Sequence, residues 1–344
     1  MQKLKNPNSG LGQFCFNLGK QFQQLNRNGL QLFFYVPPFQ KNIFGDEFTY
    51  VTQTGWNKFF SKDKIKYKVW HCIHQDSNHL PPDNKTKLIL TIHDLNFLEK
   101  YSGIKKKIRL KSLQKKVDRA NAIAVISEFT EGIVRANLQL KNKPVYIIPN
   151  GNSLKVFANE NKPDFIKFDE FIFSIGIISP KKNFHALFPL LTNNNKLHLV
   201  IAGNNESKYA GQLLDTAKKL GVENRFHLTG TIDDEQKYRL YKNCKAFVMP
   251  SITEGFGLPV VEAMSLGKPV FLSDKTSLPE VGGSEAYYWK NFEPNHIVEI
   301  FEKGIADFVS DADKAERMIK WSEKFSWEKA AKSYLELYEK LCDS

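Results

Sequence analysis

Short apolar runs rich in β-branched and aromatic residues alternate with amphipathic segments along this chain, and the alternation occurs twice. The first series of runs lies at 30–36, 69–73, 88–92, 122–126 and 145–148, and the second at 171–177, 197–202, 226–228, 246–249 and 270–272. Segments with helical periodicity separate them, near 12–27, 104–119, 128–138, 184–192, 207–220, 234–242 and 257–266. Continuous apolar runs joined by amphipathic helices are typical of buried parallel strands with helical crossovers. The sequence therefore predicts two successive doubly wound α/β domains, joined by a linker at 152–169.

The net positive charge of the chain comes from residues 1–150. Residues 1–150 contain 24 Lys and Arg against 10 Asp and Glu, whereas the remainder contains 25 against 27. Such a field attracts a polyanion or an anionic membrane surface. Residues 104–116 (IKKKIRLKSLQKK) place Ile104, Ile108, Leu110 and Leu113 on a narrow apolar stripe of a basic helix. This segment is either a solvated helix face or a membrane-contact surface, with nucleic acid as the competing partner.

The lengths of the apolar runs and the spacing of the cysteines indicate the cellular compartment of the protein. No apolar run approaches the roughly 20 residues that span a bilayer, so no transmembrane helix is predicted. The first residues lack an apolar signal core, and the four cysteines show no CxxC spacing. These features favour a reducing cytoplasm and predict neither a zinc site nor a disulfide framework.

Polar loops follow four of the predicted strands. They are His93-Asp94-Leu95, residues 149–151 (PNG), residues 179–183 (SPKKN) and residues 254–262 (EGFGLPVVE). In open parallel sheets, ligands bind beyond the carboxyl ends of the strands. We therefore expect these loops to carry the chemistry.

The loop at 254–259 (EGFGLP) is the strongest of these signals. Gly255 and Gly257 lie where a strand gives way to a helix that starts near Leu258, so free backbone N–H groups face the strand ends. Glu262 follows Glu254 by eight residues, and both carboxylates can line one cleft. Because carboxylates are acceptors only, they orient ribose or hexose hydroxyls. The loop predicts a site for a diphosphate or for sugar hydroxyls.

The segment EGFGLPVVEAMSLGKPVFLSD, followed by LPEVGG, resembles the donor-binding signature of glycosyltransferase family 4, the "glycosyl transferases group 1", which are retaining enzymes of the GT-B fold. Further blocks resemble those of the family in the right order, over nearly the whole chain: HDL, AVISEFT, IIPNG, FIFSIGIISPKKN, LVIAG, VENRFHLTGTIDDEQKYRLYKNCKAFVMPS and FSWEKAA. The resemblance implies a GT-B fold, with two Rossmann-like domains facing a central cleft. The acceptor-side domain would comprise 1–152, completed by a terminal helix at 328–344, and the donor domain would comprise 153–327.

The resemblance also implies roles for individual residues. Glu262 would bind the nucleotide ribose, and Glu254 with the loop backbone after it would hold the transferred sugar and the distal phosphate. Lys182 would neutralise the leaving diphosphate, the largest electrostatic demand of the reaction. His93 would lie near the sugar hydroxyls and the acceptor, and 229–232 would pack against the base. The implied catalytic residues are His93, Lys182 and Glu254, and the implied donor-binding residues are Gly12, Ser127, Asn150, Gly176, Lys181, Lys182, Asn183, Thr231, Ile232, Glu254, Gly255, Phe256, Gly257, Leu258 and Glu262.

The chain departs from the family pattern in two places. Ile177 stands where many members have an Arg, which removes one phosphate donor that Lys181 beside Lys182 can replace. The form G-x-x-x-P-(R/K)-K-N resembles a branch rich in mannosyltransferases and favours GDP-mannose. Only nine residues precede Gly10-Leu11-Gly12, where the family has a full strand before a glycine loop. Either the first sheet lacks its first strand or Met1 is not the true start.

The leading hypothesis is a retaining hexosyltransferase that acts on a glycan or lipid-linked glycan in cell-surface polysaccharide synthesis. It would be cytoplasmic and peripheral at the inner face of the membrane, with a nucleotide sugar as substrate, no cofactor, no metal and no nucleic-acid partner. The alternatives are a nucleotide-sugar-binding or polyanion-binding protein without turnover, and a GT-B-type sugar epimerase.

Overall fold

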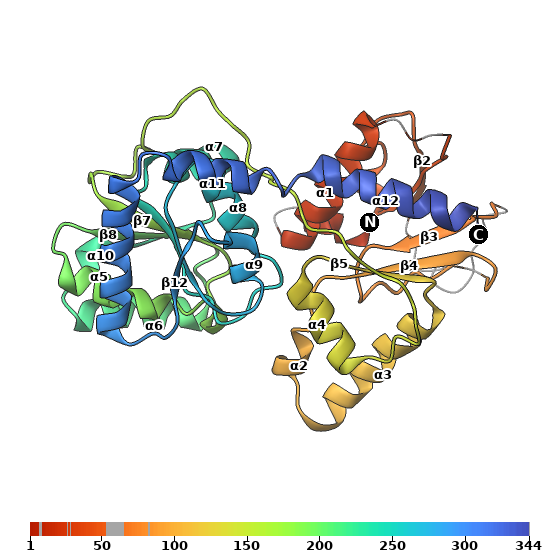
Figure 1. Ribbon diagram of the computed structural model, residues 1–344, viewed down its shortest axis with the longest axis horizontal. Helices are drawn as coiled ribbons and strands as arrows, with labels where there is room; N and C mark the ends of the chain where they lie inside the picture. Colours follow the sequence, from red (N-terminus) through yellow and green to blue (C-terminus); the bar gives the residue numbers. More distant parts are fainter. Residues whose placement is uncertain (7–8, 26, 28, 53–64, 82, 344) are drawn as a thin grey trace. The chain divides into compact units, whose positions relative to one another are not determined.

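The chain folds into two compact units. The computed structural model describes residues 1–6, 9–25, 27, 29–52, 65–81 and 83–343 (Figure 1). Unit 1 comprises residues 1–151 and 325–344, and unit 2 comprises residues 152–324. Each unit is built on parallel strands and is described by itself below.

Unit 2 contains a six-stranded parallel sheet in the order β12-β11-β10-β7-β8-β9. The strands are β7 (Phe171–Ile175), β8 (His198–Ala202), β9 (Phe226–Gly230), β10 (Ala246–Met249), β11 (Val270–Ser273) and β12 (Tyr287–Trp289). The chain builds outward from β7 through β8 to β9, then returns to the other side of β7 with β10. The strand order therefore reverses between β7 and β10, which is where open α/β sheets bind ligands.

Helices cover both faces of this sheet. They are α5 (Phe188–Asn193), α6 (Lys208–Lys219), α7 (Asp234–Asn243), α8 (Leu258–Met264), α9 (Leu278–Gly282), α10 (Pro294–Ser310) and α11 (Lys314–Ser322), with 3₁₀ turns η4 (Pro180–Lys182), η5 (Phe184–Leu187) and η6 (Glu223–Arg225). One face packs the buried residues Leu199, Val248 and Phe271 against α5, α6 and α10. On the other face, the Phe173 ring meets the Tyr241 ring of α7 at a centroid distance of 5.0 Å. These apolar runs are buried on both sides, as the sequence pattern predicts.

Unit 1 holds a four-stranded parallel sheet, β3-β4-β5-β6, and a separate parallel pair, β1-β2. The strands are β1 (Phe33–Val36), β2 (Thr49–Thr52), β3 (Val69–Cys72), β4 (Lys87–Ile92), β5 (Ala122–Val125) and β6 (Val145–Ile147). The helices are α1 (Gly10–Gln24), α2 (Phe97–Lys100), α3 (Gly103–Arg119), α4 (Glu128–Asn137) and α12 (Trp327–Cys342), with 3₁₀ turns η1 (Gln2–Lys5) and η2 (Pro38–Gln40). Helices α3 and α4 pack on one face of the larger sheet through Leu113, Val117 and Val134.

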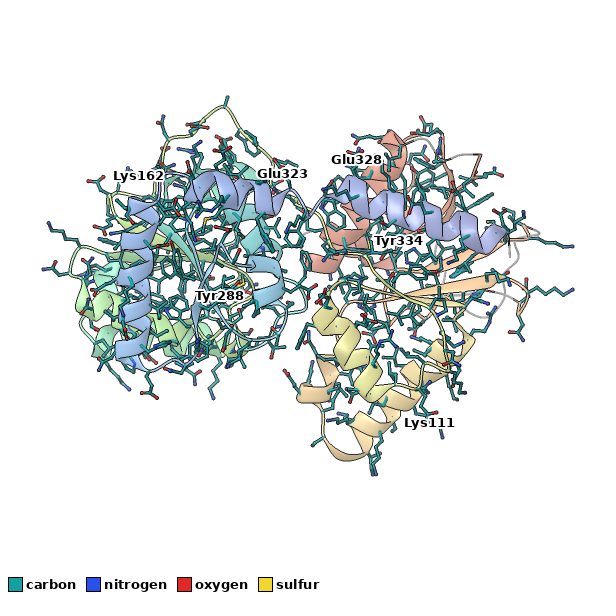
Figure 2. All side chains as sticks on the ribbon, viewed as in Figure 1. Lys111, Lys162, Tyr288, Glu323, Glu328 and Tyr334 are labelled. Carbon is teal, nitrogen blue, oxygen red and sulfur yellow. The ribbon has the colours of Figure 1, made fainter. Side chains whose placement is uncertain are left out.

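The terminal helix α12 packs beside α1 in unit 1, as the red and blue helices of Figure 1 show. Figure 2 shows Tyr334 on the side of α12 that turns toward the strands, with Glu328 on the same helix. The Tyr334 hydroxyl lies 3.0 Å from Thr91 Oγ1 on β4, and the Tyr338 hydroxyl lies 2.7 Å from His71 Nδ1 on β3. The end of the chain is therefore part of the core of unit 1.

A cavity of about 710 Å³ lies in unit 1 and is lined by residues of β1, β3, α1 and α12. Its walls include Tyr35 of β1 and Trp70 of β3, and β1 pairs with β2 alone among the described residues. Residues 53–64 lie outside the described ranges, and the expectation that the first sheet lacks a strand stays a prediction.

The sequence prediction for the strands is confirmed, because every predicted run contains a strand. Two details differ from expectation. The strand β2 was not predicted, since its four residues show no buried face and read as a loop. Gly10 and Gly12 form the first turn of α1 rather than a glycine loop. Ser9 caps this helix, and its side-chain oxygen accepts a hydrogen bond from the Gly12 N–H.

Candidate active site

The loops after β7 and β10 meet at the point where the strand order of unit 2 reverses. The loop after β7 runs from Gly176 to Asn183, and the loop after β10 contains residues 251–257. The Ile252 N–H donates to the Lys181 carbonyl at 2.8 Å, which ties the two loops together. Each loop brings one of the charged residues that the sequence singled out.

Lys182 and Glu254 form an ion pair between these loops. Lys182 Nζ lies 2.5 Å from Glu254 Oε1, and the two side chains are only 9% and 13% exposed. Desolvating two charges is costly, so a pair this deeply placed is weak evidence for stability alone. The pair provides one cation and one acceptor at the carboxyl ends of two neighbouring strands, which matches what an anionic sugar ligand needs.

The loop that carries Glu254 is held by hydrogen bonds from the segment after β11. The Thr276 hydroxyl accepts the Glu254 N–H at 3.1 Å, and the Ser277 hydroxyl donates to the carbonyls of Glu254 and Phe256. Gly257 ends the loop at φ 109° as the N-cap of α8, a conformation that a Cβ disfavours. The backbone of 254–257 is thereby fixed before any ligand arrives.

Two glycines allow the Lys182 loop to lie close to the sheet. Gly203 follows β8 at φ 151°, and a Cβ there would stand 1.9 Å from the Gly176 carbonyl oxygen. A Cβ on Gly176 would in turn meet the Lys182 side chain at 3.1 Å. Next to Lys182, the buried Asn183 has a left-handed backbone at φ 56°, and its Nδ2 has no hydrogen-bond partner among the described residues. A buried donor without a partner is costly and marks a place for a ligand acceptor.

Glu262 lies on α8 and has partners of its own. Its side chain is 6% exposed, with Oε1 2.9 Å from Lys237 Nζ. Its Oε2 accepts a hydrogen bond of 2.9 Å from the Tyr241 hydroxyl. Burial and the neighbouring Glu262 carboxylate hold the pKa of Tyr241 well above its usual value, so the phenol stays a donor. The carboxylates of Glu254 and Glu262 therefore have separate sets of polar partners in unit 2.

In unit 1, His93 follows β4 and is buried. Burial lowers the pKa of His93 to about 4, so the ring is neutral at physiological pH. Its Nε2 lies 2.8 Å from the Ile73 carbonyl, which can only accept, so this nitrogen carries the proton. Phe14 packs edge-on against the ring at a centroid distance of 4.5 Å. The remaining nitrogen, Nδ1, is left with a lone pair that can accept a hydrogen bond from a hydroxyl.

Ser127 and Asn150 are both buried in unit 1. Ser127 caps α4 through Thr130, whose hydroxyl also donates to the His93 carbonyl at 3.4 Å. The Asn150 side-chain oxygen has no hydrogen-bond partner in the described part of the chain. Ser127 is thus connected to His93, whereas Asn150 presents an unused acceptor.

The remaining predicted donor residues are less enclosed. Thr231 and Ile232 lie between β9 and α7, where Thr231 is exposed and Ile232 is half-buried. Lys181 is exposed, and its carbonyl accepts a hydrogen bond from Ile252 of the neighbouring loop. Ile177, the residue in place of the family Arg, is 69% exposed. Gly176 and Glu254 both lie against the Lys182 side chain, and the buried Asn183 follows Lys182 in the chain.

Sequence reasoning missed four residues of the site: Lys237, Tyr241, Thr276 and Ser277. Lys237 and Tyr241 are spaced i, i+4 on one helix, which places them on one face, but nothing in their spacing points to Glu262.

The described residues contain no group of three or more His, Cys, Asp or Glu that could hold a metal ion. Among the helices described, none has the length and apolar character needed to cross a bilayer.

Comparison with known proteins finds a family match for most of unit 2. Residues 157–325 match the family model described as "Glycosyl transferases group 1". The chain is 34% identical over 182 residues to the serotype-specific mannosyltransferase WbdA of Escherichia coli, covering 51% of this chain and 22% of that protein. It is 26% identical to O-antigen chain mannosyltransferase B of Escherichia coli, covering 78% of this chain and 74% of that protein. The chain thus spans only about a fifth of the length of WbdA.

Solved structures resemble the fold of the entire chain. A sucrose-phosphate synthase from Thermosynechococcus elongatus superposes with a TM-score of 0.73 at 17% identity, covering 97% of this chain and 94% of that one. HepE of Anabaena, solved in complex with UDP and glucose, gives a TM-score of 0.72 at 16% identity, covering 96% of each chain. The predicted α/β fold class of the GT-B type is confirmed.

Proposed function

We propose that this chain, whose residues 157–325 belong to the glycosyl transferases group 1 family, transfers a hexose from a nucleotide sugar to a glycan or lipid-linked glycan. The observation that carries the proposal is the enclosed Lys182–Glu254 pair. It lies inside the matched region, at the reversal of strand order where ligands of such sheets bind. The mannosyltransferase names of WbdA and O-antigen chain mannosyltransferase B support mannose as the transferred sugar. GDP-mannose as the donor follows from the form G-x-x-x-P-(R/K)-K-N of the loop at 176–183.

In the proposed reaction, the bond between the anomeric carbon and the diphosphate breaks while an acceptor hydroxyl bonds to that carbon on the same face. The acceptor proton passes to the departing phosphate oxygen, so configuration is retained and no protein base is required. Lys182 offsets the negative charge that develops on the diphosphate, and Glu254 accepts hydrogen bonds from the sugar. Asn183 Nδ2, buried and without a partner among the described residues, can donate to a phosphate oxygen. In unit 1, the neutral His93 ring can accept a hydrogen bond from a hydroxyl at Nδ1 without taking the proton.

Two variants test this assignment against a matched control. Lys182→Ala and Glu254→Ala should abolish transfer of mannose from GDP-mannose. The control is Lys245→Ala, because Lys245 pairs with Glu170 just before the same two strands, at their opposite ends. Transfer by the control at the wild-type rate is expected. Full transfer by either site variant would refute the assignment.

Ligand binding separates the alternatives. Nucleotide stabilisation of the wild-type protein is measured by thermal unfolding with GDP, UDP, GDP-mannose and UDP-glucose, since a ligand of the native state raises the midpoint. Binding without transfer to any glycan acceptor would favour a binding protein without turnover. Conversion of a nucleotide sugar without an acceptor would favour an epimerase. Binding that depends steeply on salt and is indifferent to Glu262 would favour a polyanion-binding protein.

The proposal includes contact with an anionic membrane through α3. Ile104 and Ile108 are 78% and 60% exposed on the face opposite the buried Leu113 and Val117. The prediction of one apolar stripe that joins these isoleucines to Leu110 and Leu113 is therefore wrong, because the two leucines pack into the core of unit 1. Lys111, on the same exposed face, projects outward in Figure 2. Exposed isoleucines surrounded by lysines fit the interface of anionic lipids, which takes up apolar side chains and attracts cations.

Vesicles that contain phosphatidylserine test this contact by sedimentation. Replacing Lys105, Lys106 and Lys107 by Glu should weaken vesicle binding while leaving nucleotide affinity unchanged. The control carries the same charge change on the exposed residues Lys208, Lys218 and Lys219 of α6. Equal vesicle binding by the α3 variant and the control would exclude the contact.

A further inference from the structure

Both oxygens of the Glu262 carboxylate are engaged from one helix. Lys237 and Tyr241 stand one turn apart on α7, and each contributes one donor to one oxygen, at 2.9 Å in both cases. Each carboxylate oxygen has two lone-pair positions, so one position on each oxygen remains available. The two donors fix the plane of the carboxylate and therefore the direction of its free lone pairs.

This arrangement exceeds what is needed to join α7 to α8. The helix α7 has its own capping box, formed by Asp233 and Gln236. Tyr241 also packs its ring against Phe173 and Phe247. A buried ion pair is commonly no more stabilising than apolar side chains of the same size, so tethering alone does not account for an almost fully buried carboxylate. A fixed pair of acceptors side by side instead matches two neighbouring hydroxyls, which is what a ribose presents.

We propose that Lys237 and Tyr241 are positioning residues that orient Glu262 toward the 2′- and 3′-hydroxyls of the donor ribose. The inference rests on the proposed function and on the role of ribose ligand that the family resemblance implies for Glu262. Lys237 balances the charge of the carboxylate when no nucleotide is bound, and Tyr241 sets its rotation. Neither residue needs to touch the nucleotide, so their effect is confined to recognition of the ribose hydroxyls.

The test compares GDP with 2′,3′-dideoxy-GDP, using calorimetric affinities for the wild type, Tyr241→Phe and Lys237→Met. The wild type should prefer GDP. Each variant should bind GDP about tenfold more weakly, as expected for the loss of one hydrogen bond to a charged group, and should bind the dideoxy analogue as the wild type does. Lys237→Arg should restore part of the preference, because the guanidinium keeps the charge and a donor. The control is Lys242→Met. Lys242 lies on the same helix, and its loss removes an ion pair with Glu160.

The outcomes separate this inference from the proposed function. If the wild type prefers GDP and the Tyr241 and Lys237 variants keep that preference, the positioning role is overturned and the donor site stands. Equal weakening of both nucleotides would overturn it too, because that pattern indicates a general structural role. If the wild type binds both nucleotides equally, Glu262 is not the ribose ligand and the positioning role is overturned, while the donor site at Lys182 and Glu254 stands. If the wild type binds neither nucleotide, the GDP-mannose donor of the proposed function fails, and the positioning role fails with it. Lys237 is 16% exposed, so Lys237→Met gives a readout even if Tyr241→Phe folds poorly.

Discussion

Replacing Lys182 by Met leaves the Glu254 carboxylate without its cation. The two side chains are 9% and 13% exposed, and their charged atoms lie 2.5 Å apart. Removing one partner of a buried pair costs about 3–5 kcal/mol, because a desolvated charge is left behind. Glu254 retains some access to water, which places the expected loss in the free energy of unfolding of unit 2 near the lower limit, at about 3 kcal/mol.

This loss is large enough to measure and has an internal check. For a domain of this size, about 3 kcal/mol corresponds to a fall in melting temperature of about 6–12 °C. The double variant Lys182→Met/Glu254→Gln removes both charges, so its loss should be smaller than the sum of the two single losses. Lys245→Met breaks the pair with Glu170, where the side chains are 34% and 31% exposed, and should cost no more than about 1 kcal/mol.

The assay is thermal unfolding with and without GDP or GDP-mannose. The wild type should gain stability from the nucleotide, and Lys182→Met should gain less at the same nucleotide concentration, because the cation proposed to face the diphosphate is absent. Lys245→Met should gain as much as the wild type. If Lys182→Met melts at the wild-type temperature and is stabilised by the nucleotide to the full extent, the reasoning about this pair is refuted.

Three further substitutions or conditions follow from the geometry. Gly203→Ala should lower both the stability of unit 2 and its affinity for the nucleotide, because the new Cβ would stand 1.9 Å from the Gly176 carbonyl oxygen. The control is Gly211→Ala, where the new Cβ has open space around it. Equal melting temperatures of the two variants would contradict the argument. Gly151→Ala should destabilise unit 1 by about 1–3 kcal/mol, since its Cβ would meet the Trp327 nitrogen at 2.0 Å, and an unchanged melting temperature would show that the backbone adapts. Burial lowers the pKa of His93 to about 4 and that of His74 to about 3, from 6.5. Below pH 6.5 the unfolded chain therefore binds protons at these histidines that the folded chain excludes. The free energy of unfolding of unit 1 should fall as the pH drops from 6.5 to 4, by about 3 kcal/mol for His93 alone. A melting temperature that stays constant over this range would contradict the prediction.

The loops of the candidate site were predictable because each follows a buried strand, and a buried strand is visible in the sequence as a short run of apolar residues. The EGFGLP segment carries its own evidence, since a glycine pair between a strand and a helix needs no distant partner to be recognised. Two local predictions were incomplete for equally local reasons. Gly10 and Gly12 suggested a loop, but Ser9 supplies a helix cap three residues before Gly12. The strand β2 has no buried residue to distinguish it from a loop.

The partners of each charged residue were not predictable. Lys182 and Glu254 are 72 residues apart and meet only because β10 pairs with β7. Lys237 looks like an ordinary surface lysine of an amphipathic helix until α7 is packed beside α8. The protonated nitrogen of His93 depends on the Ile73 carbonyl of a neighbouring strand end.

The sequence by itself determined the two α/β domains, the loops of the candidate site and the family of residues 157–325, because hydrophobic periodicity and motif spacing are properties of consecutive residues. The tertiary structure decided which charges pair, which lone pairs stay free and which side chains lose their water. Those properties depend on strand order and helix packing, which bring together residues that the chain keeps far apart.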